Sequence, residues 1–293
     1  QVDVVDDLSS GSLGNLADAR ATAGGALTIH QLDIRLPELV DLVVRRRPEV
    51  VFHLAAQADV RVSVAQPVFD ADVNILGSLN VLEGARRAGA ARIVFAASGG
   101  TLYGEPAPAD LPAREALPHR PLSPYGVAKK SVIDYLVAYR ELHELEFSAL
   151  ALANVYGPRQ DPHGEAGVVA IFAQHLVDRS PVTIFGSGDQ TRDFVYVDDV
   201  VDAFVRAATR GGGLVCNIGT GDETSVNDLY RVMATEAGVD VEPVHAPARP
   251  GELLRSSLDN GRANIQLGWS PWTGLADGTR AVVDFVRARS AQT

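Results

Sequence analysis

A tyrosine and a lysine four residues apart carry the most informative chemistry in this sequence. Ser123 and Pro124 come directly before Tyr125, and a serine N-cap followed by proline is typical of the start of a helix. Residues four apart lie on one helix face, one turn above the other. We therefore expect the Lys129 ammonium to lie beside the Tyr125 phenol.

The charge of the lysine would make the phenol a useful base. An unperturbed tyrosine has a pKa of about 10, so ionising it at pH 7 costs about 4 kcal/mol. A positive charge about 4 Å away contributes about 4 kcal/mol at an effective dielectric constant near 20. The pair is thus able to act as a general base toward a hydroxyl group. The alternative is a surface pair, which is the commoner role of a tyrosine and a lysine at this spacing.

Small hydroxyl residues follow an apolar segment about twenty-five residues earlier. Residues 92–97 read as a short strand, and the sequence continues as Ser-Gly-Gly-Thr-Leu-Tyr-Gly over residues 98–104. In open parallel α/β sheets, ligands bind at the carboxyl ends of the strands. Ser98 and Thr101 are therefore candidates for a role beside the base.

The two segments together resemble the extended short-chain dehydrogenase/reductase family, of the nucleotide-sugar epimerase type. In that family a serine or threonine at a strand end, followed shortly by Tyr-Gly, acts with a tyrosine and a lysine. The resemblance implies that Tyr125 and Lys129 are catalytic and that Ser98 is their hydroxyl partner. The usual register places Gly99 at the hydroxyl position, so Thr101 stays an alternative partner.

The fold expected from this resemblance is α/β: a Rossmann-type doubly wound parallel sheet with a smaller, discontinuous α/β substrate lobe. The sequence begins with a strand that ends in Asp6 and Asp7, without the glycine-rich turn that normally precedes such an acid by about 20 residues. We therefore expect roughly 25 to 30 further residues upstream, carrying the first strand, the glycine turn and the first helix. Without that strand, the sheet would have an open position in its middle.

We expect an NAD-binding domain over residues 1–155 and 190–218, and a substrate-binding domain over residues 156–189 and 219–293. A loop rich in serine, glycine and alanine is expected between Ser9 and Leu27. The hydrophobic patterns predict strands over 27–30, 49–54, 147–153, 182–186 and 214–218, and helices over 36–47, 66–89, 168–178 and 225–236, with a short strand near 241–245 and two closing helices. The strand over 49–54 is expected to be buried.

NAD is the expected cofactor. An acid at the end of the second sheet strand, here Asp6, would bind the adenosine ribose hydroxyls and would repel the 2′-phosphate of NADP. Asn74 is a weak helix former inside a predicted helix, and its family counterpart supports the active-site backbone; a simple exposed asparagine is the alternative. The full set of expected cofactor positions is Asp6, Asp7, Asp33, Ile34, Leu54, Ala55, Ala56, Asn74, Tyr125 and Lys129.

The resemblance implies inversion at C4 of a UDP-hexose, as in members that act on UDP-glucose and UDP-galactose, through a transient 4-keto intermediate. Arg192 and Arg249 would contact the diphosphate, Phe185 would pack on uracil, and Ser256 would lie beside the sugar 2-substituent. The expected substrate positions are Asn154, Val168, Phe185, Arg192, Arg249 and Ser256.

Three other functions stay open. A UDP-glucuronate 4-epimerase would share the same residues. A nucleotide-sugar 4,6-dehydratase or decarboxylase would need additional groups, and the family's dehydratases carry an Asp-Glu pair where this sequence has Gly99 and Gly100. An NAD-binding regulatory protein without turnover is the non-enzyme alternative, although such a protein needs no general base.

The composition limits the other partners. With a net charge of −11, the chain lacks the excess of basic residues that a nucleic-acid partner requires. The single cysteine, Cys216, cannot form an internal disulfide, and no secretory signal or run of 18 apolar residues is present. We expect a cytoplasmic protein without a membrane partner.

Neither His53 nor its neighbours show the spacing of a metal site, so a core histidine and no bound metal are expected. The resemblance implies a homodimer through helices 66–89 and 124–143. The alternative is that Val132, Leu136 and Tyr139 face the core of their own chain.

Overall fold

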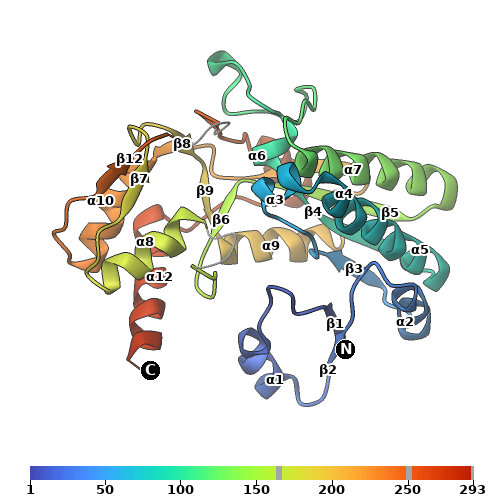
Figure 1. The fold of residues 1–293 in the computed structure, drawn as a ribbon. Helices are drawn as coiled ribbons and strands as arrows, with labels where there is room; N and C mark the ends of the chain where they lie inside the picture. The colour runs from blue at the N-terminus through green and yellow to red at the C-terminus, as the bar shows by residue number, and fades with distance from the viewer. Residues whose placement is uncertain (163–166, 249–252, 292–293) are drawn as a thin grey trace. The chain divides into compact units, whose positions relative to one another are not determined.

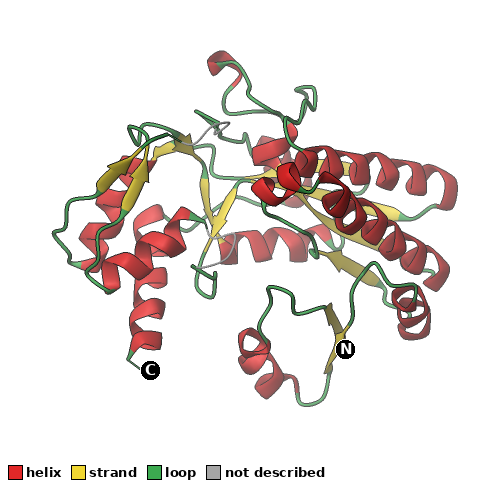
Figure 2. Cartoon of the chain, in the orientation of Figure 1, coloured by secondary structure: helices red, strands yellow, loops and turns green. Residues whose placement is uncertain are grey.

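The computed structural model describes residues 1–162, 167–248 and 253–291 (Figure 1). The chain divides into two compact units. The first unit comprises residues 1–96 and 122–148, and the second comprises residues 97–121 and 149–293. Both contain helices and parallel strands, so the predicted α/β class is confirmed (Figure 2). The predicted division into cofactor and substrate domains is a division by function and stays a prediction.

The first unit begins with two parallel strands, β1 (Val2–Asp6) and β2 (Leu27–Gln31). A 3-10 helix, η1 (Leu13–Leu16), and the helix α1 (Ala17–Ala23) connect them. The prediction of a loop was therefore wrong here, because alanine favours a helix more than any other residue does. Gly24 ends α1 at a φ of 53°, a conformation that glycine adopts easily.

Strand β3 (Val50–His53) pairs in parallel with β4 (Arg92–Ser98). The four-stranded sheet has the order β10 (Leu214–Ile218), β5 (Glu146–Leu152), β4, β3, whereas β1 and β2 form a sheet of their own. The prediction of a buried strand was wrong for Phe52, which is 45% exposed, because β3 is an end strand. The upstream residues expected from the sequence stay a prediction.

The helices of the first unit pack on one another. Helix α7 begins as predicted, because the Ser123 hydroxyl accepts the Gly126 N–H at 3.2 Å and Pro124 occupies the first turn. Val132 and Leu136 are each 1% exposed and face the core of their own chain. The helices are α2 (Glu38–Arg46), α3 (Val60–Ala65), α4 (Pro67–Ala71), α5 (Ser78–Ala88) and α7 (Pro124–His143).

The helix predicted over residues 66–89 is interrupted. A π-helical turn, η2 (Asp72–Gly77), lies between α4 and α5. Such turns are uncommon and occur frequently at functional sites. Asn74 lies in this turn and is 2% exposed.

Two glycines allow α5 and the π turn to approach their neighbours closely. A Cβ added at Gly84 would lie 3.0 Å from Cβ of Val43 on α2. A Cβ added at Gly77 would lie 2.7 Å from Cγ1 and Cδ1 of Ile34, which follows β2. The sequence therefore brings the segment after β2 directly against the turn that carries Asn74.

The second unit contains a parallel pair formed by β6 (Asn154–Tyr156) and β9 (Phe194–Tyr196). Two shorter pairs are formed by β7 (Thr183–Phe185) with β12 (Val244–Ala246), which is parallel, and by β8 (Thr191–Arg192) with β11 (Thr224–Ser225), which is antiparallel. Strands β7 and β12 confirm the strands predicted over 182–186 and near 241–245. One of the predicted substrate residues lies in each of β6, β7 and β8.

Three helices of the second unit share a hydrophobic core. They are α8 (Val168–Val177), α10 (Val226–Ala237) and α12 (Leu275–Ser290), and Phe172, Leu229, Met233 and Val283 are buried among them. The remaining helices of the unit are α6 (Gly99–Leu102), η3 (Pro108–Asp110), α9 (Val197–Ala207) and α11 (Gly261–Leu267). The predicted helices over 168–178 and 225–236 and the two closing helices are confirmed.

Candidate active site

Tyr125 and Lys129 lie one turn apart near the start of α7. The Lys129 ammonium nitrogen is 5.6 Å from the centre of the Tyr125 ring and 4.8 Å from that of Phe95. It also donates a hydrogen bond of 2.9 Å to the carbonyl of Ala96 on β4. The lysine is thus held between its own helix and the neighbouring strand, beside the phenol.

Lys129 is buried, with 3% of its surface exposed. Removal from water disfavours an ammonium ion and lowers the pKa of Lys129 to about 8, while the negative charge of Asp70 partly opposes this fall. At pH 7 the charged form is still the major one. The positive charge that the proposed base requires is therefore present.

Asn74 is hydrogen-bonded to the backbone after β3. Its side chain accepts the Gln57 N–H at 2.9 Å and donates to the Gln57 carbonyl at 2.8 Å. It also donates to the Asp70 carboxylate at 2.9 Å. These contacts and its burial exclude the alternative of a simple exposed asparagine.

Asp6 and Asp7 lie at the carboxyl end of β1. The Asp6 carboxylate accepts the Leu8 N–H at 2.7 Å, and the Asp7 carboxylate accepts the Ser9 N–H at 2.9 Å. A Cβ added at Gly11 would lie 3.0 Å from an Asp6 oxygen. The backbone therefore turns tightly around the Asp6 carboxylate.

The other expected cofactor residues of the first unit also follow strands. Asp33 comes soon after β2, and hydrogen bonds from the Arg35 guanidinium hold the pKa of Asp33 below its usual range. Ile34 is 8% exposed and packs on the π turn. The segment 54–56, which is Leu-Ala-Ala, comes directly after β3. The small side chains of Ala55 and Ala56 would let a ligand approach the backbone there.

Ser98 and Thr101 belong to the second unit. Ser98 ends β4, and the Thr101 hydroxyl on α6 donates to the Ser98 carbonyl at 3.4 Å. Their role beside Tyr125, which belongs to the first unit, stays a prediction.

The expected substrate residues of the second unit lie on several elements. Asn154 begins β6, Val168 begins α8, Phe185 ends β7 and Arg192 ends β8, whereas Ser256 lies in the segment before α11 and Arg249 lies outside the described residues. Glu223 connects two of these places. Its carboxylate accepts hydrogen bonds from the Thr191 hydroxyl at 2.5 Å and from the Arg255 guanidinium at 3.0 Å. Thr191 is next to Arg192 and Arg255 is next to Ser256, so one carboxylate holds both neighbours.

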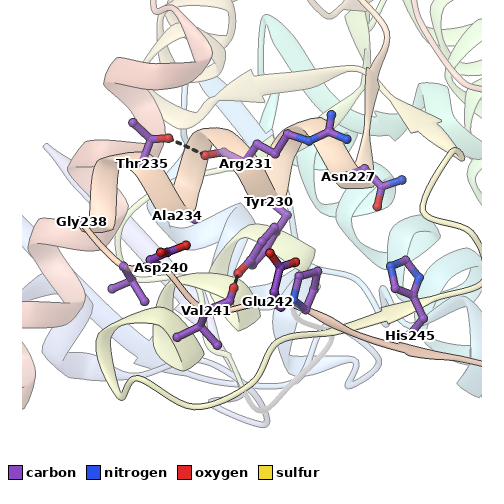
Figure 3. A pocket seen from close by; sticks show the side chains of 12 residues that line it. Asn227, Tyr230, Arg231, Ala234, Thr235, Gly238, Asp240, Val241, Glu242 and His245 are labelled. Carbon is purple, nitrogen blue, oxygen red and sulfur yellow. Dashed lines mark hydrogen bonds between the residues drawn. The ribbon is translucent and has the colours of Figure 1, made fainter.

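A separate cavity of about 680 Å³ lies between α10 and the segment 238–245 (Figure 3). The Tyr230 hydroxyl donates to the Val241 carbonyl in this region, and the side chains of Arg231, Glu242 and His245 line it. None of the expected site residues described by the structure lines this cavity. It is distinct from the places that the sequence assigns to the cofactor and the substrate.

His53 is a core histidine, as the sequence predicts. It is 3% exposed, and its Nε2 lies 2.8 Å from the Ser78 hydroxyl. That hydroxyl donates its one hydrogen to the Asn74 carbonyl at 2.7 Å, so the histidine must be the donor through Nε2. Burial, together with the charge of Lys129, lowers the pKa of His53 to about 3, and the ring is therefore neutral at pH 7.

Asp70 is a buried residue near Lys129 that was not among the residues predicted from the sequence. This aspartate is 1% exposed, and its carboxylate accepts hydrogen bonds from the side chains of Gln57 and Asn74. Its position four residues before Asn74 was the available signal, because that spacing favours contact on a helix.

Within residues 1–162, 167–248 and 253–291, no group of three or more histidine, cysteine, aspartate and glutamate side chains is arranged to hold a metal ion. In the same ranges, no helix combines the length and apolar character needed to cross a membrane.

Comparison with known proteins decides the family. A model described as the NAD dependent epimerase/dehydratase family matches residues 1–219, which is more than half of the chain. The chain belongs to this family. The predicted family is confirmed, and NAD, the expected cofactor, is the one that the family description names.

Relatives in the NAD dependent epimerase/dehydratase family cover nearly the whole chain. A UDP-glucose 4-epimerase of Mycolicibacterium smegmatis is 48% identical over 287 residues, covering 98% of this chain and 90% of its own. A putative UDP-glucose 4-epimerase of Methanocaldococcus jannaschii is 42% identical over 284 residues, with 97% and 90% covered.

Solved structures in the family have the same fold. The UDP-glucose 4-epimerase of Thermotoga maritima with UDP-glucose is 42% identical, with a TM-score of 0.93 over 100% of this chain and 92% of that chain. The Thermus thermophilus UDP-glucose 4-epimerase complex with NAD is 40% identical, with a TM-score of 0.89 over 98% and 91%. This likeness confirms the predicted α/β fold with a parallel sheet.

Proposed function

We propose that this chain is an isomerase that interconverts UDP-glucose and UDP-galactose by inverting C4 of the hexose with NAD. The observation that carries the proposal is the buried Lys129 ammonium beside Tyr125 on α7. The two relatives at 48% and 42% identity, both named UDP-glucose 4-epimerase, support this choice of substrate.

Tyr125 acts as the base in this mechanism. Its phenolate removes the proton of the sugar 4-hydroxyl, and the Ser98 or Thr101 hydroxyl assists by hydrogen bonding. Bound NAD would supply the hydride acceptor and donor for C4. After the 4-keto sugar turns over, Tyr125 returns the proton to the oxygen at C4, whose configuration is then inverted. One proton and one hydride leave and come back, so no net oxidation occurs.

In this proposal, NAD binds to the first unit. Asp6 would bind the adenosine ribose in the tight turn that Gly11 permits, and Ala55 and Ala56 leave the backbone after β3 accessible. Asn74 fixes that backbone through Gln57. Asp7, Asp33, Ile34 and Leu54 complete the proposed cofactor set, with Lys129 toward the nicotinamide ribose.

The second unit would hold the UDP-sugar. Asn154, Val168, Phe185, Arg192, Arg249 and Ser256 form the proposed set. Arg192 would bind the diphosphate and Phe185 would pack on uracil, which anchors the nucleotide and leaves the hexose free to turn. Binding energy from such remote groups can retain an intermediate that must not escape.

The proposal includes a cytoplasmic homodimer. Exposed apolar side chains support pairing through α4, the π turn and α7. Val68 on α4 is 83% exposed, Leu76 in the π turn is 56% exposed, and Val127, Tyr135 and Leu142 on α7 are 49%, 41% and 74% exposed. Val127, Tyr135 and Leu142 recur at helical spacing, on one face of α7.

Incubation with UDP-galactose, followed by identification of the hexose, tests the function. The unmodified chain should form UDP-glucose. Tyr125→Phe should lower turnover about 10³-fold, since it removes the general base, while NAD binding is retained. Tyr135→Phe, an exposed tyrosine on the same helix, is the matched control and should retain activity.

Turnover that survives in Tyr125→Phe would remove this residue from its proposed role. Epimerisation of UDP-glucuronate without reaction of UDP-galactose would replace the proposed substrate, and NAD binding without any turnover would favour a regulatory protein.

A further inference from the structure

Asp70 is a buried carboxylate whose two oxygens differ in their hydrogen bonding. One of its oxygens accepts hydrogen bonds of 2.9 Å from each of the Gln57 and Asn74 side-chain amides. Its second oxygen, Oδ2, is buried and has no hydrogen-bond partner within the part of the chain that the structure describes. A carboxylate in such surroundings is costly unless a positive charge balances it.

The elements packed against α4 limit which residues can provide a positive charge near Asp70. They are α3, the π turn and α7. On α3, Arg61 pairs with Asp59 at 2.7 Å, and on α7, Lys130 pairs with Asp134 at 2.8 Å. Both of these cations are therefore engaged with carboxylates of their own.

The remaining charged groups near the pair are also accounted for. Asp72 of the π turn pairs with Arg35 at 3.0 Å, and Arg35 also pairs with Asp33. His53 on β3 is neutral at pH 7, and Tyr125 carries the reacting phenol. Lys129 is the cation on α7 that is buried, and its hydrogen bond goes to the neutral carbonyl of Ala96.

We propose that Asp70 is the counter-ion of Lys129 and thereby a positioning residue for the reaction, which keeps the ammonium charged beside Tyr125. The inference rests on the proposed function for the role of Tyr125. Two buried groups of opposite charge offset each other's loss of hydration, whereas either one alone would tend to neutralise.

The pairing has a consequence for the pH range of activity. The pKa of Lys129 is about 8 with the attraction of Asp70 already acting. Without that attraction the ammonium would lose its proton at a lower pH, and the phenol would lose its neighbouring cation. The Asn74 amide, which fixes the Asp70 carboxylate, also braces Gln57, so one network supports both the charge and the backbone after β3.

The sequence permits a direct measurement, because Lys129 and Lys130 are its only two lysines. Incorporating lysine labelled with ¹³C at Cε gives one signal for each, and Lys130, whose side chain is 37% exposed, serves as an internal reference. In Asp70→Asn, the Lys129 titration midpoint should fall by about one pH unit or more, while that of Lys130 stays unchanged. This substitution preserves an oxygen that can accept both hydrogen bonds.

Asp72→Asn is the matched control, since it removes a carboxylate only two residues away whose side chain is 43% exposed and paired with Arg35. The Lys129 midpoint should not move in this variant. An unchanged Lys129 midpoint in Asp70→Asn would overturn the proposal.

A kinetic measurement tests the link to the reaction. The ratio of turnover in Asp70→Asn to that of the unmodified chain should fall about tenfold between pH 6.5 and 8.5, because the variant loses the ammonium first. A ratio that is low but independent of pH would show a structural role and would also overturn the proposal.

The two measurements separate the two proposals. A shifted Lys129 midpoint in a chain that does not convert UDP-galactose would support the counter-ion role of Asp70 and refute the proposed function. Turnover with an unshifted midpoint would support the function and refute the counter-ion role.

The unmodified chain provides a further test if Asp70→Asn does not fold. Burial raises the pKa of Asp70, so the Lys129 signal should show a second, smaller inflection as this carboxylate takes up its proton, above the usual range of an aspartate. The Lys130 signal should not show it. Absence of this inflection from the Lys129 signal would contradict the pairing.

Discussion

Two buried side chains of the first unit, His53 and Lys129, have pKa values lower than those they would have in water. His53 donates through Nε2 to Ser78, and Ser78 donates to the Asn74 carbonyl, so the imidazole is fixed as a neutral donor. Lys129 has a pKa of about 8, below the ordinary lysine value of 10.5, so it loses its charge at a lower pH than an exposed lysine does. Both groups lie in a buried environment that disfavours positive charge, and the pKa of His53 is lowered further than that of Lys129.

The neutral His53 should make the fold sensitive to acid. Its folded-state pKa of about 3 is lower than the ordinary value of 6.5, so between these limits the unfolded chain binds a proton that the folded chain does not. The contribution of the neutral His53 to the free energy of unfolding is fully present above pH 6.5. It is lost as the pH falls, by about 3 kcal/mol at pH 4. His53→Gln keeps an N–H donor and removes this titration.

Denaturant unfolding at pH 7.5 and pH 4 checks this expectation. The free energy of unfolding should fall by about 3 kcal/mol less in His53→Gln than in the unmodified chain. His143→Gln, at an exposed position on α7, should follow the unmodified chain. Parallel losses in all three proteins would contradict the assignment of a neutral, buried His53.

At the scale of elements, the contrast between α7 and the α4–η2–α5 segment shows what the sequence can and cannot predict. The start of α7 depends on Ser123, Pro124 and the apolar spacing behind them, and all of these signals are local. The π turn contains Asn74, whose side chain is bonded to Gln57, seventeen residues earlier. A contact of that kind is absent from a local pattern, so a continuous helix was the natural prediction.

The close approach at Gly77 should be needed for stability. In Gly77→Val, the new Cβ would lie within 2.7 Å of the buried Ile34 side chain, and the added methyl groups would increase the overlap. We expect a loss of about 2 kcal/mol in the free energy of unfolding, measured with urea. Leu76→Val, at an exposed position of the same turn, should change it little. Equal free energies of unfolding for both variants would show that the Ile34 side chain can move aside without loss of stability.

The same distinction applies to the candidate site. Tyr125 and Lys129 could be predicted because four residues on one helix determine their proximity. A role for Asp70 as the counter-ion of Lys129 could not be proposed from the sequence, because α4 and α7 are more than fifty residues apart in sequence and meet only in the folded unit. The roles expected for Ser98 and the substrate residues stay predictions, since they were implied by resemblance.

At the scale of the whole molecule, exposed apolar side chains on the first unit make assembly testable. Glutamate at both Leu76 and Tyr135 would place charge on the proposed dimer surface, and we expect this double variant to have the mass of one chain in light scattering. Ile265→Glu, at a position 78% exposed on α11, should leave a dimer intact. A mass of one chain for the unmodified protein would refute the dimer.

Strand β3 is the last strand in the order β10, β5, β4, β3 within the described part of the chain. The end strand of a sheet is a template on which a strand from another molecule can add. We therefore expect concentrated solutions of residues 1–293 to associate through this sheet edge as well as through helix faces. Charge placed on the helices would leave this second route of association open.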